Sequence, residues 1–340
     1  MTTQESAGIS TVARPVTWPC GFWRRVGAAL IDSLVLGAVG ASLGFVWGDA
    51  FARLGQSGRW LGFAIAGVYF IVLQARTGQS LGKMALALKV VRLDGTPIDA
   101  SQSAVRYVAL GLPWILNGMY FEGSGAPAFV LVAAGVLLGV VVFSGVFGNL
   151  YLLLFNVPSR RLFHDWIAST VVVRTAALPC LPEASQVSLR RVHLGMVAGL
   201  VMAVFGVFLW IGLALGTGFK GLEPLIAIQR QLNALPGVQS TQVTENWSNG
   251  SKQGREHTLN IIVRLAPSAH ERRRAIALAA VARALDVWKF GKTDAVGVQV
   301  AEGYDIGIAE KWWSEGERHT AAEWFEVLRK AGVNSGDVKT

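Results

Sequence analysis

Residues 25–36 read RVGAALIDSLVL, an apolar run that begins with arginine and contains one acid, Asp32. The apolar sequence continues to Trp47, and about 20 such residues suffice for a helix to cross a bilayer. Placing an ionised carboxylate inside a bilayer costs about 2.5 to 3.5 kcal/mol on insertion scales, so such acids normally face a polar partner or a wet cavity. We therefore expect a membrane helix in which another polar group of the chain shields Asp32 from lipid.

The composition supports a membrane protein. Of the 340 residues, 52% are hydrophobic and 16% are charged, and the mean hydropathy is +0.43, far from the values typical of a soluble enzyme. The two cysteines, Cys20 and Cys180, are isolated, so we expect neither a disulfide framework nor a metal site, and no cofactor. The net charge of +9 comes mainly from the membrane part, and no recognition motif indicates nucleic-acid binding.

Five apolar stretches are candidates for membrane passes. The fourth is long, about 45 Å at 1.5 Å per residue, but two halves would each be too short to cross. We therefore count it as one helix that tilts or overhangs the bilayer. The five stretches are residues 26–47, 60–73, 104–118, 126–155 and 192–215.

Lysine and arginine predict the orientation, because cytoplasmic loops retain them. Thirteen lie before residue 26, in 75–106 and in 156–191, against two in the loops on the other side. The N-terminus is then cytoplasmic, and after five passes the chain ends outside a bacterial cell membrane. The expected parts are a tail (1–21), a membrane domain (22–175), a cytoplasmic linker (176–191), a fifth membrane helix (192–216) and an extracytoplasmic domain (217–335).

The outer segment reads as a small α+β domain with the order α-β-β-α-β-β-α. It shows no nucleophile beside a base and no phosphate-binding loop, so we expect a binding or assembly module and no enzyme. Its partner would be an extracytoplasmic protein or a cell-envelope ligand. The expected elements are residues 222–235 (helix), 238–247 and 257–265 (strands flanking the turn SNGSKQG), 271–288 (helix), 295–300 and 304–309 (strands), and 319–332 (helix).

Two short β-branched runs lie in the predicted cytoplasmic loops, Lys89 to Leu93 and Thr170 to Arg174. Each is too short to span a bilayer and favours a pleated, half-buried surface. Unpaired strands leave backbone groups without partners, so we expect the two runs to form a two-stranded ribbon. Cysteines at Val91 and Val172 should then crosslink. The ribbon would hold Asp165 close to the cytoplasmic end of the first helix, where Arg25 lies.

Three motifs in this order are familiar together. RVGAALID carries Arg25 and Asp32, GQSLGKMALALKVVRLDG covers residues 78–95, and FHDWIASTVVV carries His164 and Asp165. They resemble the RDD family of bacterial membrane proteins, over about residues 20–174. The resemblance implies an integral membrane domain in which Arg25, Asp32 and Asp165 are the named residues, with transport suspected and sodium/proton exchange attributed to some members.

Two hypotheses follow for the membrane domain. In the first, it anchors the outer domain, and Arg25, Asp32 and Asp165 form a structural polar network with His164 as an interfacial neighbour. In the second, it moves a proton, cation or small ligand with Asp32 as carrier, and a homo-oligomer is needed because five helices are few for a carrier. The outer domain favours the first, since a plain transporter needs no such appendage. Lys83 is expected to place its charge at the lipid headgroups.

Overall fold

The computed structural model describes residues 20–117, 119, 128–157, 159–177, 191–217, 219–250, 254–288, 290 and 294–333. The predicted N-terminal tail, most of the linker 176–191, Cys180 and the centre of the SNGSKQG turn lie outside these residues. The chain divides into two compact units. The first is Met1–Asp32, Tyr69–Leu110 and Asn149–Val197, and the second is Ser33–Val68, Gly111–Gly148 and Ala198–Thr340.

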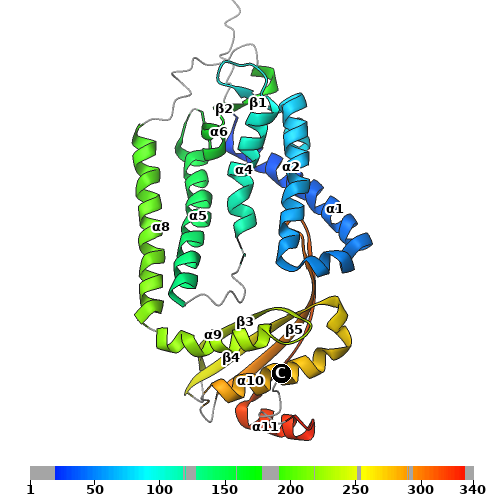
Figure 1. Ribbon diagram of the computed structural model, residues 1–340. Coiled ribbons are helices and arrows are strands. Elements are labelled where there is room, and N and C mark those ends of the chain that lie inside the picture. Colours follow the sequence, from blue (N-terminus) through cyan, green and yellow to red (C-terminus); the bar gives the residue numbers. More distant parts are fainter. Residues whose placement is uncertain are drawn as a thin grey trace, which may run out of the picture. The chain divides into compact units, whose positions relative to one another are not determined.

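Helices make up most of the part before residue 218 (Figure 1). The predicted fourth pass is one uninterrupted helix, which confirms that it should not be divided. The helices are α1 (Phe22–Leu54), α2 (Gly58–Thr77), α3 (Leu81–Ala85), α4 (Ala100–Leu116), α5 (Ala128–Phe155), α6 (Phe163–Ile167) and α8 (Arg191–Thr217), with the 3-10 turns η1 (Gly55–Ser57) and η2 (Thr175–Ala177).

Among the described residues, three helical segments are long and apolar enough to cross a membrane: Phe22–Thr77, which includes α1 and α2, Phe129–Phe155 and Arg191–Leu213. The helix α4 has 17 residues, fewer than the other candidate helices, and it contains Pro113. A membrane protein is therefore supported, whereas the expected count of five passes is not confirmed.

The predicted ribbon is present in the first unit. Strand β1 (Leu88–Arg92) pairs antiparallel with β2 (Thr170–Arg174), which confirms the expected pairing. Val91 lies opposite Val171 and Val90 opposite Val172, so the proposed cysteine pair was one residue out of register. One face of the ribbon packs on Ala28 of α1, on Cys20 just before α1 and on Ile98 between β1 and α4. The buried side chains of this cluster are Cys20, Ala28, Leu88, Val90, Ile98 and Val172.

The predicted α+β part has seven main elements in the expected order. A four-stranded sheet runs β3-β4-β5-β6, parallel between β4 and β5 and antiparallel elsewhere. The elements are α9 (Phe219–Asn233), β3 (Val238–Gly250), β4 (Gly254–Leu265), α10 (Arg273–Val287), β5 (Ala295–Asp305), β6 (Glu310–Thr320) and α11 (Ala321–Lys330), with the 3-10 helix η3 (Pro267–Arg272) before α10.

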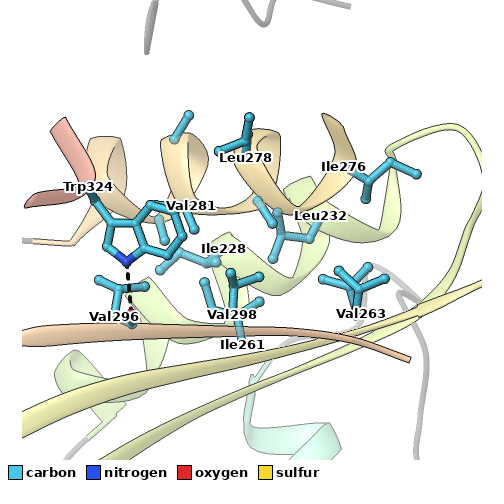
Figure 2. Packing of buried hydrophobic residues seen from close by; sticks show 14 of the residues in the cluster. Ile228, Leu232, Ile261, Val263, Ile276, Leu278, Val281, Val296, Val298 and Trp324 are labelled. Carbon is cyan, nitrogen blue, oxygen red and sulfur yellow. Dashed lines mark hydrogen bonds between the residues drawn. The ribbon is translucent and has the colours of Figure 1, made fainter. Parts of the chain in front are cut away.

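The core of this part lies between one face of the sheet and the helices (Figure 2). Alternate residues of β4 and β5 project into it, and side chains of α9, α10 and α11 complete it. Trp324 of α11 is fully buried and donates its indole N–H to the backbone carbonyl of Val296 at 2.8 Å. The helix α11 begins with a capping box in which Thr320 and Glu323 satisfy each other's backbone N–H groups.

The sequence prediction failed at the last strand. YDIGIA, residues 304–309, is not a strand but the end of β5 and the turn that follows it, and the fourth strand is Glu310–Thr320. Gly307 has a φ of +77°, which the turn requires. The strand β6 was missed because it is exposed along almost its whole length and rich in charge, so it lacks apolar alternation.

The apolar residues of this turn pack against α1, within the second unit. Tyr304 and Ile306 are buried against Phe51 and Ala52 of α1. The rings of Tyr304 and Phe51 meet edge to face with centroids 5.8 Å apart. Glycines provide the space, because a Cβ at Gly62 of α2 would collide with the carbonyl oxygen of Ile306.

Polar contacts join the same segments. Arg59 of α2 pairs with Asp305 at 2.9 Å. Gln239 of β3 donates from its side-chain amide to the carbonyl of Ala52 at 2.5 Å. The β5–β6 turn (residues 305–309) is thus packed against α1, where its contacts extend from Gly40 to Ala52, and against the first residues of α2.

Candidate functional site

Asp32 is buried in the first unit, with 3% of its surface exposed. Its carboxylate accepts hydrogen bonds from the Tyr69 hydroxyl at 2.6 Å, the Ser80 hydroxyl at 2.6 Å and the backbone N–H of Gly82 at 2.8 Å. The ammonium nitrogen of Lys83 lies 4.0 Å away. The expectation that polar groups from elsewhere in the chain shield Asp32 is therefore confirmed.

Two glycines of the GQSLGK motif make this arrangement possible. A Cβ at Gly82 would collide with the backbone carbonyl oxygen of Ala28, so only glycine lets α3 approach α1 closely enough to donate to Asp32. Gly78 has a φ of +74°, a left-handed conformation, and a Cβ there would lie 2.8 Å from the carbonyl oxygen of Val90. The motif is therefore a loop and a short helix shaped to bond one carboxylate.

Asp165 forms the second centre and is fully buried. Arg25 donates to one carboxylate oxygen at 3.1 Å, and Arg106 of α4 donates to the other. The backbone N–H of Leu162 also donates to Asp165, at 3.1 Å, and the His164 Nε2 lies 3.4 Å from it. One carboxylate thus bridges α1, α4 and the start of α6.

The arginines also tie the backbone of the loop after α5. Arg161 donates to the carbonyl of Thr170 at 2.9 Å and to that of Asp165 at 3.2 Å. Arg25 donates to the backbone carbonyls of Ser159 and Arg160, in the loop after α5, and to that of Val172 in β2. Arg25 therefore holds this loop and β2 against the start of α1, and Arg161 ties the loop to α6 and β2.

The electrostatics keep Asp165 ionised and His164 neutral. Burial alone would raise the pKa of Asp165, but the guanidinium groups of Arg106 and Arg25 outweigh burial and hold it well below its ordinary value. Burial lowers the pKa of His164 to about 3, although the charge of Asp165 acts in the opposite direction. At cellular pH the imidazole carries no charge.

The structure brings Arg25, Asp165 and His164 together in one centre and places Asp32 at a second set of donors. Sequence reasoning missed Arg106, which was counted only as a basic residue of a cytoplasmic loop. Its position inside an apolar stretch was the available indication, since a charge there normally has a partner. Tyr69, Ser80 and Gly82 were also missed, because uncharged donors leave no distinctive pattern in one sequence.

The C-terminal α+β part also contains a buried ionisable group. The ring of His257 in β4 lies between two carboxylates, with Nε2 2.7 Å from Glu245 and Nδ1 3.2 Å from Asp294. Glu245 and Asp294 face different nitrogens of the ring. One metal ion bound to a single ring nitrogen could therefore not also be bound by both carboxylates. Within the described residues, no group of three or more His, Cys, Asp or Glu side chains could hold a metal ion.

Comparison with known protein families gives a match in the first half of the chain. Residues 19–169 match the model of the RDD family, a family of membrane proteins. This region contains Arg25, Asp32, Lys83, Arg106 and Asp165, whereas the α+β part falls outside the match. Comparison with curated proteins and with solved structures gives no match.

Proposed function

Starting from the RDD family match over residues 19–169, we propose that this membrane domain anchors the C-terminal α+β domain outside a bacterial cell membrane. That outer domain would bind an extracytoplasmic protein or an envelope ligand. We propose no enzymatic activity for either part. The buried polar network of the membrane domain has, in this proposal, a structural role.

The observation that carries the proposal is that each of the two carboxylates accepts hydrogen bonds from three groups of the protein. Asp32 accepts from a tyrosine, a serine and a backbone N–H, and Asp165 accepts from two arginines and a backbone N–H. A carboxylate that carries ions must exchange its partners during each cycle. Donors that come from different helices and loops instead favour a role in holding those elements together.

The packing of the β5–β6 turn supports anchoring as well. Tyr304 and Ile306 are buried among residues of α1 and α2, and Arg59 pairs with Asp305. A flexibly tethered domain would need no such contact. The turn would instead hold the outer domain directly against α1 and the start of α2.

For the topology, we propose five passes, formed by α1, α2, α4, α5 and α8. The helix α4 would cross with about 25 Å of length at 1.5 Å per residue, a short span for a hydrocarbon core of about 30 Å. The distribution of Lys and Arg supports a cytoplasmic position for the N-terminus and the β1–β2 ribbon in this proposal. An odd number of passes then places α9 to α11 outside.

The orientation can be tested with reporter fusions. A reporter that is active only in the cytoplasm should work when fused after residue 100 or 175 and should be inactive after residue 230. A second reporter, active only outside, should give the complementary pattern and so control for expression. Cytoplasmic activity after residue 230 would mean that the number of passes is even and that the α+β domain lies in the cytoplasm.

Transport of a proton, cation or small ligand is the second candidate function. The observation that favours it is the burial of Arg25, Arg106, Asp32 and Asp165 in one domain of a membrane protein, because such residues often mark ion pathways. It ranks second because each carboxylate already has its partners.

A further inference from the structure

The tip of the β5–β6 turn differs in composition from turns that lie in water. It reads Ile306-Gly307-Ile308-Ala309, whereas turns in water are mostly built from polar residues, glycine and proline. The backbone N–H of Ile306 donates to the carbonyl of Ala309 at 3.0 Å, and that of Gly307 donates to the Asp305 carboxylate at 2.7 Å. These two donors are thus satisfied without water, as a position at the edge of a bilayer requires.

The turn meets α1 inside the apolar stretch of that helix. This stretch ends at Trp47, where α1 is kinked. A Cβ at Gly40 would lie 2.8 Å from the Cβ of Ala309 and 3.0 Å from the Cγ1 of Ile308. The step from Gly40 to Trp47 covers about 10 Å along the axis at 1.5 Å per residue. If α1 crosses a bilayer, the tip of the turn therefore lies up to about 10 Å deeper than Trp47.

The surface of α1 beyond these contacts is apolar and exposed. Phe45 has 92% of its surface exposed, and Val46 is exposed as well. Trp47 and Trp60 of α2 are also exposed, and exposed tryptophans are typical of the interface between membrane and water. Since this stretch of α1 falls within both the family match and a candidate membrane span, lipid is the surrounding that its exposed side chains fit.

Behind the tip, the hairpin becomes first charged and then aromatic. Arg59 of α2 pairs with Asp305 at 2.9 Å, and Glu310 lies opposite Asp305 in the β5–β6 ladder. Trp312 and Trp313 follow on β6 and are 40% and 48% exposed. The order from the tip is thus apolar, charged and aromatic. It matches a hairpin whose tip touches the acyl chains and whose next residues lie among the headgroups.

We propose that the β5–β6 turn is a lipid-contacting element, whose exposed side meets phospholipid at the headgroup–acyl boundary while Trp312 and Trp313 lie in the headgroup region. The lipid is that of the leaflet at this end of α1. The inference rests on the proposed function, in which α1 crosses the membrane, and adds that the α+β domain itself touches the bilayer. Contact with lipid as well as with α1 and α2 would fix the distance of this domain from the membrane.

Spin labels on single cysteines measure the depth of the turn in the full-length protein, in phosphatidylcholine nanodiscs. The variants are Glu310→Cys beside the tip, Phe45→Cys on α1 and Glu326→Cys on the exposed side of α11, with Cys20 and Cys180 changed to Ser. Oxygen concentrates in lipid and a neutral nickel chelate in water. The label at position 310 should collide with the chelate several-fold less often than the label at 326, and more often than the label at 45.

The two reference positions separate failure of this inference from failure of the proposed function. A protected label at 45 with a label at 310 as accessible as that at 326 would place the turn in water and overturn the inference alone. A label at 45 as accessible to the chelate as that at 326 would remove α1 from the bilayer and overturn both. Protection of position 310 from oxygen and chelate alike would mean that protein, such as a second copy, covers the turn instead of lipid.

A second measurement needs no label and follows the two tryptophans of β6. The fluorescence of the wild type minus that of Trp312→Phe/Trp313→Phe reports these rings, in nanodiscs whose lipids carry a nitroxide quencher at the headgroup or deep in the acyl chain. The headgroup nitroxide should quench this difference more strongly. Trp324→Phe is the control, because Trp324 is buried in the α+β core and should escape both quenchers. Equally weak quenching of both differences would contradict the proposed position of Trp312 and Trp313.

Discussion

Replacing Asp165 with Asn is expected to destabilise the membrane domain by about 3 to 5 kcal/mol, because Arg25 and Arg106 then remain buried without a counter-ion. The amide also cannot accept bonds at both positions, so the contact to Arg25 or to Arg106 is lost. The free energy of unfolding in detergent, followed through the unfolding of the helices, measures the effect.

The control for this prediction is Asp99→Asn. Asp99 pairs with Arg92 near the ribbon, but the pair is exposed, so its loss should change stability only slightly. Similar stability losses for the two variants would mean that the Asp165 centre is not a structural core of the domain.

Replacing Gly62 with Leu is expected to displace the β5–β6 turn from α2, because the carbonyl of Ile306 occupies the space that the new side chain needs. A disulfide between Cys replacing Ala52 of α1 and Cys replacing Gln239 of β3 reports whether the α+β part stays against these helices when the turn is displaced, in a background with Cys20 and Cys180 changed to Ser. The crosslink should form readily in the otherwise unaltered protein and be largely lost with Gly62→Leu.

Gly37→Leu is the matched control, since a Cβ at this α1 glycine meets nothing within 4 Å. It adds the same bulk to a membrane helix and should leave the crosslink unchanged. If both glycine variants crosslink as efficiently as the parent, the turn does not rest on α2 in the protein.

Local sequence patterns predicted the ribbon well. The two β-branched runs each restrict the chain locally, and antiparallel pairing satisfies the backbone groups that remain. The register was harder, because neighbouring valines at 90, 91, 171, 172 and 173 make a shift of one residue nearly indistinguishable in sequence.

The partners of Asp32 could not be predicted, for a different reason. Its donors are a hydroxyl of α2, a serine hydroxyl and one backbone N–H, which become donors to this carboxylate only when α3 lies against α1. Arg106 was predictable in principle, because a charge two residues inside an apolar stretch needs a partner. The turn at 304–309 was misread because its apolar residues pack against helices far away in sequence. Apolar alternation alone does not reveal whether a segment packs in a sheet or against such helices.

Flux through the reconstituted protein tests most directly whether the buried network is structural. The full-length protein and its Asp32→Asn variant would be placed in sealed vesicles under imposed proton, sodium and potassium gradients. The structural account predicts that neither protein moves these ions faster than protein-free vesicles do. Ion movement by the wild-type protein that disappears in the Asp32→Asn variant, with both proteins inserted equally, would contradict it.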